Sequence, residues 1–496
     1  MKIAFVNDSC ERLGVEYISA VLKANGHQVK LFADPQLFDD ENISVKWLSR
    51  VFDYKKRLIS ELKAYKPDLI GISVVTDFYQ WACTMAKMIK QEIDVPIIFG
   101  GIHPTSVPER VIKNDFVDMV CVGEGEYPIL ELANSMEKGL IDYSIKNIWF
   151  KRNGSIIQNE VRPLIEDLDS LPMADKELYY SASPHFSQCY YIMASRGCAL
   201  SCSYCCHSYL KKIYNGRGTY LRVRSVSNVI EELRQAKSRY NIKFIRFWDD
   251  HFPIDIKWLN EFKYRYKKEI NVPFICYLYP KNISLEVIEY LKESGCCEIN
   301  IGIQTWNERI NSSVLYRGMS NAETERIVDI IKDKKINLTV DTILGIPGQT
   351  EQDDIEFIKF CIRKKIKHIY FGWLRYFPNT DITLESKKNG YITSAKYEEI
   401  NNGLNARTHS LGGDTGSSEF VGFMLLVRLT KLLPNFVINF IMRNKIYRYF
   451  PKIIPLRLTI YLWESTLHSY DHVISSKIDT CRYRHFIKNK LRLNNV

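Results

Sequence analysis

The 496-residue sequence lacks any uninterrupted apolar run of about 18 residues, the length that a membrane-spanning helix needs. Its first apolar run ends at Val6, too early for the core of a secretory signal. Internal repeats and low-complexity tracts are also absent. We therefore expect a cytoplasmic protein, whose cysteines are metal ligands or core thiols rather than disulfides.

Acidic residues are scarce in one part of the chain. Residues 421–496 hold 13 Lys and Arg against the three acids Glu464, Asp471 and Asp479, whereas the net charge of the whole chain is +11. The first 420 residues are therefore close to neutral. We do not expect this body to bind nucleic acid, and an anionic partner should meet the C-terminal region.

Residues 1–145 alternate between short apolar runs and amphipathic stretches. The strand-like runs are Lys2–Asn7, Gln28–Phe32, Leu69–Val74, Pro96–Gly100 and Met119–Val122. Helical patterns occupy Val15–Ala24, Tyr54–Ala64, Tyr79–Gln91 and Tyr127–Ser135. This alternation predicts an α/β domain with a doubly wound, Rossmann-like parallel sheet. Such a sheet binds its ligand at the carboxyl ends of the strands, where glycines allow the backbone to approach closely.

The rest of the chain divides into three parts. Residues 146–183 are polar and interrupted by proline, which predicts a linker. Residues 184–391 contain six strand-like runs at Tyr190–Ala194, Phe244–Trp248, Pro273–Tyr277, Glu298–Ile303, Asn337–Leu344 and His368–Trp373. Helical patterns follow the first five, so we expect a partial TIM-type (β/α)6 barrel with its chemistry at the C-terminal strand ends. Residues 392–496 form a basic, mainly helical region, with a Gly/Ser-rich candidate lid at 411–418.

Four of the 13 cysteines lie between Cys198 and Cys206. Cys198, Cys202 and Cys205 have the spacing CxxxCxxC, and three thiolates on one loop can hold three irons of a 4Fe–4S cluster. The fourth iron would remain open to a ligand. A zinc knuckle completed by Cys206 or His207 is the alternative, although adjacent cysteines reach one tetrahedral metal with difficulty and structural zinc usually needs a distant second ligand pair.

The loop Ser195–Cys205 resembles the CxxxCxΦC signature of radical S-adenosylmethionine (SAM) enzymes, with Tyr204 at the aromatic position near the SAM adenine. Later segments resemble SAM contacts of that family in the same order along the chain. These are Asp249 and Asp250 for the methionyl amine, Gln304 and Thr305 for the ribose, and Gly345 near the adenine. Arg317 is a candidate for the SAM carboxylate, because a guanidinium binds a carboxylate in a bidentate manner. The sequence departs from the family at Gln304, where Glu is common, and at Gln349–Glu351.

The N-terminal part resembles the cobalamin-binding domain that precedes the barrel in one large radical SAM class, the class B methyltransferase-like enzymes. With the barrel, the resemblance covers about residues 1–380. The matching segments are Arg12–Tyr17, Asp68–Ser73, Gly100–Pro104 and Gly123–Glu126. They imply cobalamin contacts at Leu13, Gly14, Ser73, Gly100, Gly101, His103, Gly123 and Glu124. The DxHxxG signature is absent around Asp8, which implies no cobalt-binding histidine from that motif. The lower face would instead be covered by residues 74–77, with His103 at the corrin edge.

The resemblance implies reductive cleavage of SAM and transfer of a methyl group from cobalamin to an unactivated carbon. The substrate would be a small or lipid-like molecule, and the electron donor a flavodoxin or ferredoxin. A cyclase or rearrangement enzyme with the same cofactors, a methylthiotransferase and a non-enzymatic cobalamin or iron–sulfur sensor remain alternatives. The basic C-terminal region would either touch an anionic membrane surface or cap the open barrel.

We predict that replacing Cys198, Cys202 and Cys205 together by alanine abolishes cluster binding. Anaerobically reconstituted protein should lose both the visible absorbance of the cluster and reductive SAM cleavage, because no other loop supplies this ligand spacing. Cys206→Ala is the matched control and should retain both. A full complement of iron in the triple variant would contradict the assignment.

Overall fold

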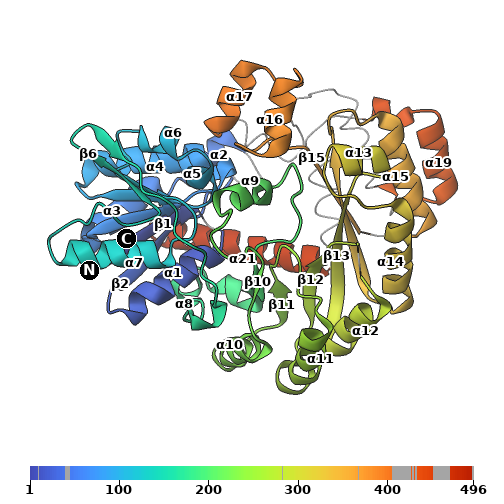
Figure 1. The fold of residues 1–496 in the computed structure, drawn as a ribbon, viewed down its shortest axis with the longest axis horizontal. Coiled ribbons are helices and arrows are strands. Elements are labelled where there is room, and N and C mark those ends of the chain that lie inside the picture. The colour runs from blue at the N-terminus through green and yellow to red at the C-terminus, as the bar shows by residue number, and fades with distance from the viewer. Residues whose placement is uncertain are drawn as a thin grey trace.

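The computed structural model describes residues 1–8, 10–39, 45–281, 283–366, 368–404, 426, 429–430, 433–450 and 470–493. Two sheets dominate it, and both predicted α/β units are confirmed. In Figure 1 the N-terminal domain, in blue, lies on the left and the barrel, from green to orange, on the right.

The N-terminal sheet has the strand order β2-β1-β3-β4-β5-β6-β7, and its first five strands run parallel. These five strands are β1 (Lys2–Asp8), β2 (Gln28–Asp34), β3 (Leu69–Ser73), β4 (Ile97–Gly100) and β5 (Met119–Cys121). The order reverses between β1 and β3, and such a switch point opens a crevice at the carboxyl ends of the strands.

Helices cover both faces of this sheet, because alternate side chains along β1 point to opposite sides. Phe5 packs in one core with α1 (Leu13–Ala24) and α7 (Glu126–Glu137). Val6 packs in another with α3 (Lys55–Tyr65) and α4 (Tyr79–Glu92). The shorter helices of the domain are η1 (Thr76–Phe78), α2 (Lys46–Val51), α5 (Ile102–Ser106) and α6 (Pro108–Ile112).

Part of the predicted linker belongs to the sheet. β6 (Ile148–Arg152) pairs antiparallel with β5, and β7 (Ser155–Ile157) pairs antiparallel with β6. Asn153 and Gly154 connect them with φ angles of 48° and 76°, as a two-residue hairpin turn requires. β7 forms the edge of the sheet and is partly exposed, whereas Ile148 and Phe150 of β6 are buried. The apolar start of β6 and the Asn-Gly turn were the signals that could have revealed the hairpin.

The barrel sheet is open, with the order β15-β14-β13-β12-β11-β8 and all neighbours parallel. Its strands are β8 (Cys189–Ile192), β11 (Phe244–Phe247), β12 (Phe274–Leu278), β13 (Cys296–Gln304), β14 (Asn337–Leu344) and β15 (His368–Trp373). The outer helices are α10 (Val226–Arg239), α11 (Ile256–Arg265), its π-helical extension (Tyr266–Ile270), α12 (Leu285–Ser294), α14 (Asn321–Asp333) and α15 (Glu351–Arg363). A short ribbon of β9 (Ser195–Arg196) and β10 (Arg222–Val223) flanks α9 (Cys206–Ile213), and α13 (Glu308–Ser313) follows β13.

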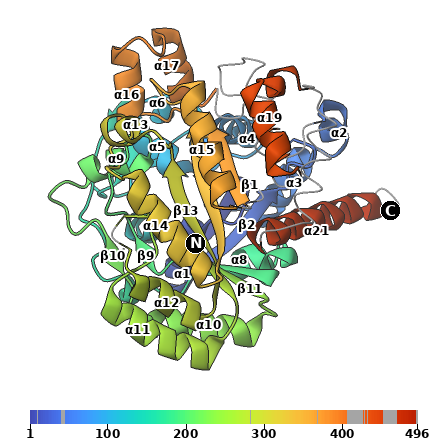
Figure 2. The same ribbon diagram turned by 90° about the vertical axis from the view of Figure 1, so that its right-hand side faces the viewer.

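The C-terminal region packs against both domains. Its described helices are α16 (Asp381–Lys388), α17 (Ser394–Asn401), α19 (Asn435–Arg443), η5 (Ile446–Tyr449) and α21 (Tyr470–Leu493). Figure 2 shows α21 projecting sideways from the barrel. It packs on the N-terminal domain, where the Tyr483 hydroxyl accepts a hydrogen bond from the Phe38 amide at 3.1 Å. Among the described residues, no helix is both long and apolar enough to cross a membrane. The candidate lid at 411–418 lies outside the described residues.

The segment between the domains carries a buried charge cluster. It contains η2 (Leu168–Ser170) and α8 (Glu177–Tyr180), and η3 (Pro184–Gln188) follows it. Lys176 Nζ lies 2.7 Å from Glu11 Oε1 and 2.7 Å from Glu16 Oε2, and all three side chains are almost completely buried. Burial raises the pKa of Glu16 well above its usual range, although Lys176 opposes the shift. Burial lowers the pKa of Lys176, but Glu11 and Glu16 together raise it above its usual value.

We predict that Lys176→Met lowers the free energy of unfolding by about 3–5 kcal/mol, because it leaves buried carboxylates without their cation. The midpoint of chemical denaturation measures the change. The loss should shrink as the pH falls, since protonation removes the uncompensated charges. Lys146→Met, which breaks a half-exposed ion pair with Glu160, should cost less than about 1 kcal/mol. Equal effects of the two substitutions would contradict the role assigned to Lys176.

Candidate functional site

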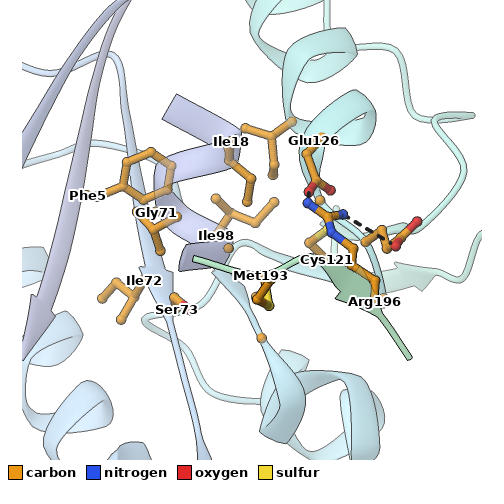
Figure 3. A pocket seen from close by; sticks show the side chains of 18 of the residues that line it. Phe5, Ile18, Gly71, Ile72, Ser73, Ile98, Cys121, Glu126, Met193 and Arg196 are labelled. Atoms are coloured by element: carbon orange, nitrogen blue, oxygen red, sulfur yellow. Dashed lines mark hydrogen bonds and ion pairs between the residues drawn. The ribbon is translucent and has the colours of Figure 1, made fainter. Parts of the chain in front are cut away.

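A cavity of about 320 Å³ lies between the two domains, at the carboxyl edge of the N-terminal sheet. Figure 3 shows it with Phe5, Ile18 and Ile98 on one side and Arg196 on the other. Met193, Arg196, Gly197 and Asp250 of the barrel domain complete its wall. The cavity therefore joins the strand ends of the N-terminal domain to the loop that carries the cysteines.

Two glycines give the cavity a close-fitting rim. Gly101 has a φ of +97°, and a Cβ there would lie 2.8 Å from the Val74 carbonyl oxygen. Gly123 has a φ of +85°, and its Cβ would lie 1.9 Å from the Tyr214 hydroxyl. A side chain fits at neither position. An apolar floor under a backbone rim of this kind suits part of a large ring-bearing cofactor such as cobalamin.

The predicted cobalamin contacts separate into two groups. The residues that line the cavity are Gly14, Ser73, Gly100, Gly101, Gly123 and Glu124. Leu13 and His103 do not line it. His103 is fully buried, with Nδ1 3.2 Å from Thr76 Oγ1 and its ring 4.1 Å from the Tyr79 ring. Burial lowers the pKa of His103 to about 3, with a smaller contribution from Arg110. The described structure thus packs His103 against Thr76 and Tyr79 outside the lining of this cavity, and its buried Nε2 has no hydrogen-bond partner among the described residues.

Glu124 and Glu126 fasten the two domains together at the cavity wall. Arg196 Nη2 lies 2.7 Å from Glu126 Oε1, and Arg222 Nη1 lies 2.9 Å from Glu124 Oε1. The Arg196 guanidinium also lies 4.8 Å from the centre of the Tyr17 ring. Sequence reasoning did not single out Arg196, although its position two residues before Cys198 was a usable signal.

The three predicted cluster ligands lie together in or near the protein interior. Cys198 and Cys202 are buried and Cys205 is half-buried. Burial, with smaller contributions from Asp250, Cys202 and Cys205, raises the pKa of the Cys198 thiol to about 11. A bound metal would reverse this preference, because a coordinated thiol is deprotonated. The donor set and its loop fit a cluster held by three thiolates.

The candidate ligands of the alternative zinc site also lie close together. Ligand atoms of Cys205, Cys206 and His207 lie within 4.8 Å of one another. Both ring nitrogens of His207 are occupied, however: Nδ1 lies 2.6 Å from the Tyr220 hydroxyl and Nε2 lies 2.8 Å from Asp250 Oδ2. This leaves His207 without a nitrogen for a metal in this arrangement, which favours the cluster over zinc.

Arg317 holds the cysteine loop from the far side of the barrel. Its Nη1 donates to the Tyr204 hydroxyl at 2.8 Å and to Cys202 Sγ at 3.4 Å, and Nη2 donates to the Gly302 carbonyl. Buried Nε has no hydrogen-bond partner among the described residues. The predicted contact between Arg317 and the SAM carboxylate would therefore use Nε or replace one of these hydrogen bonds.

The other predicted SAM contacts lie at the carboxyl ends of neighbouring strands. Asp249 Oδ1 accepts a hydrogen bond from Ser195 Oγ at 2.5 Å, whereas its buried Oδ2 has no partner among the described residues. Burial raises the pKa of Asp249 to about 7. An unpaired buried carboxylate oxygen suits the methionyl amine of SAM. Asp250 differs from this expectation, because it faces the inter-domain cavity and His207.

Gln304, Thr305 and Gly345 mark the ends of β13 and β14. Gln304 has a φ of +69°, an uncommon backbone conformation for a residue other than glycine. Thr305 is buried. A Cβ at Gly345 would lie 2.5 Å from the Trp373 ring, so only glycine fits there. Strained and close-packed positions of this kind concentrate at functional sites.

Comparison with known proteins agrees with this geometry. The B12 binding domain model matches residues 3–133 and the radical SAM superfamily model matches residues 192–361. An uncharacterized methyltransferase of Pyrococcus horikoshii is 27% identical over 379 residues, 74% of this chain and 76% of the relative. The anaerobic magnesium-protoporphyrin IX monomethyl ester cyclase of Rubrivivax gelatinosus is 22% identical, covering 68% of this chain and 59% of the cyclase. The structure of the radical SAM methyltransferase TsrM from Kitasatospora setae, with cobalamin and a [4Fe-4S] cluster bound, superposes with a TM-score of 0.63 at 18% identity, covering 78% of each chain.

The chain is a radical SAM enzyme. It belongs to the cobalamin-dependent radical SAM enzymes, in which a B12-binding domain precedes the radical SAM domain. Its cofactors are accordingly a 4Fe–4S cluster, SAM and cobalamin, as predicted from the sequence.

We predict that cobalamin binds without a nitrogen ligand from His103, because that side chain is buried beside Thr76 and Tyr79. In the cob(II)alamin form, electron paramagnetic resonance should show no superhyperfine splitting from an axial nitrogen. His103→Ala should leave the spectrum unchanged. Nitrogen splitting that disappears in His103→Ala would assign the histidine to cobalt instead.

Proposed function

We propose that this enzyme is a C-methyltransferase that acts on an unactivated carbon of a small-molecule or lipid-like substrate. One observation carries the proposal: the inter-domain cavity is lined both by the strand-end glycines and by Arg196, Gly197 and Asp250 beside the cysteine loop. A shared wall allows one substrate to reach both cofactor sites. When bound, the cofactors would supply reductive SAM cleavage and a transferable methyl group.

The residues of the chain would position these cofactors. Cys198, Cys202 and Cys205 would hold the cluster, while Arg317 fixes their loop through Cys202 and Tyr204. Asp249 would accept the methionyl amine. The remaining predicted contacts, Gln304, Thr305 and Gly345 for SAM and Gly14, Ser73, Gly100, Gly101 and Gly123 for cobalamin, keep these proposed roles. Leu13 and His103 would support the cobalamin site from behind it.

The inside of the barrel supports a largely apolar substrate. Tyr191 and Trp248 stack with their ring centres 5.5 Å apart, and the Tyr277 ring lies 5.6 Å from Trp248. Phe247 packs outward among the helix aromatics, so the next residue, Trp248, faces the lumen. Tyr191 and Tyr277, on the neighbouring strands β8 and β12, contact Trp248 there. Trp248 is 48% exposed. An accessible aromatic wall beside the cysteine loop suits a hydrocarbon or ring system.

The opposite side of the lumen offers buried hydrogen-bonding groups. Asn300 Oδ1 and Asp341 Oδ1 are buried and have no hydrogen-bond partner among the described residues. Burial raises the pKa of Asp341 to about 7, while Asn300 and Arg317 oppose the shift. At neutral pH the acid is therefore partly protonated and can donate or accept. A substrate with one polar group at its reacting end would form hydrogen bonds with Asn300 and Asp341.

A cyclase that uses the same cofactors is the second candidate, favoured by the similarity to the magnesium-protoporphyrin ester cyclase. In either case the electron would come from a flavodoxin- or ferredoxin-type donor. The near-neutral catalytic body gives nucleic acid no favourable surface charge.

The test follows an isotopic methyl group. The reconstituted, reduced enzyme, incubated with CD3-labelled SAM and fractionated cell extract, should form 5′-deoxyadenosine, S-adenosylhomocysteine and a CD3-labelled product detected by mass spectrometry. We predict that Trp248→Leu lowers labelled product roughly tenfold, about 1.4 kcal/mol of binding, by removing the aromatic wall. Tyr264→Leu, an exposed residue on α11, is the control. Formation of 5′-deoxyadenosine without S-adenosylhomocysteine or labelled product would reject methyl transfer and favour the cyclase.

A further inference from the structure

Helix α19 carries apolar side chains on two faces. Ile438, Ile441 and Met442 are buried and belong to the main hydrophobic core. Phe436 and Phe440, four residues apart and therefore on one side of the helix, are 74% and 60% exposed. Burial of the first face explains why the helix docks, but it does not explain the two phenylalanines on the other.

The turn that follows adds a third exposed aromatic residue near the helix. η5 packs against α19 and ends at Tyr449, which is 86% exposed. We define the α19 patch as Phe436, Phe440 and Tyr449. In Figure 1, α19 lies at the edge of the molecule opposite the N-terminal domain, away from the inter-domain cavity. The patch is therefore separate from the cofactor sites.

Basic residues border the α19 patch. Lys445 Nζ and Arg448 Nη2 lie 3.0 Å and 2.7 Å from Glu351 Oε2. Arg443 is also exposed, and no ion pair joins it to a described residue. Residues 421–496 as a whole contain ten more basic than acidic residues. The local charge complements an anionic partner.

We propose that the α19 patch docks on an anionic membrane surface, with Phe436, Phe440 and Tyr449 at the headgroup boundary and the neighbouring cations against lipid phosphate. A nine-residue helix is about 13 Å long, too short to span a bilayer but suited to lie in its interface. Aromatic side chains favour that boundary, and each nearby basic residue adds attraction to anionic lipid. The proposal goes beyond the proposed methyl transfer and would bring a lipid-like substrate to the barrel.

The experiment is vesicle co-sedimentation of the full-length holoenzyme. Vesicles of phosphatidylcholine alone are compared with vesicles that also contain phosphatidylserine, across a salt series. The wild type should sediment with the anionic vesicles at low salt and be released as salt rises. Phe436→Ser with Phe440→Ser should weaken this binding at least roughly tenfold, because each serine removes most of an apolar side chain from the interface.

Matched variants separate docking from misfolding. Phe436→Trp with Phe440→Trp should retain vesicle binding, and Tyr264→Ser, which removes an equally exposed aromatic residue elsewhere, should not change it. Reductive SAM cleavage in solution should be the same in all of them, so a failure here is distinguishable from a failure of the proposed function. Equal recovery with neutral and anionic vesicles, undiminished binding of the double serine variant, or aromatic-dependent binding to single-stranded DNA but not to vesicles would overturn the proposal.

Discussion

Arg196 links the two halves of the active region. Its guanidinium meets Glu126 at the start of α7, while its backbone lies in β9 immediately before the cysteine loop. Arg222, the antiparallel partner of Arg196 in β10, meets Glu124 from the same ribbon. Two cations and two carboxylates shielded from water interact more strongly than they would at the surface, so a small ribbon can fix the position of a whole domain. The distance between the cysteine loop and the glycine rim therefore depends on this contact.

Several ionisable groups of the barrel domain are buried near the site. Asp249 follows β11, Asp341 lies within β14 and Arg317 follows α13, and burial raises the pKa of both acids to about 7. Burying an ionisable group costs free energy unless the group has a hydrogen-bond partner. Among the described residues, however, Asp249 Oδ2, Asp341 Oδ1 and Arg317 Nε have none. An enzyme that must bind the amino acid portion of SAM together with a substrate needs unsatisfied groups of this kind.

The sequence predicted the two sheets well, because short apolar runs such as those of β1 and β14 depend on local pattern alone. It placed the cysteine loop and the glycine rim for the same reason: strand ends in a parallel sheet meet at one edge. It failed where the outcome depends on distant partners. The pairing of β6 with β5 cannot be recognised from the local pattern, and the packing of His103 against Tyr79 and Thr76 is likewise a long-range contact. The position of Arg196 beside the cysteine loop was visible in the sequence, but its partner Glu126 on α7 was not.

The C-terminal region shows how far composition alone can lead. Its excess of basic residues suggested both a cap on the barrel and a membrane contact, and charge cannot separate these, since either arrangement leaves most cations in water. The position of the phenylalanines does separate them. A cap needs one apolar face, which Ile438, Ile441 and Met442 supply, and α21 likewise buries Phe486 against Tyr54 on the N-terminal domain. Phe436 and Phe440 contribute nothing to either contact, so capping and lipid binding use different faces of the same helix. The two interpretations are therefore compatible, because a helix that packs on the core through one face can rest on a bilayer through another.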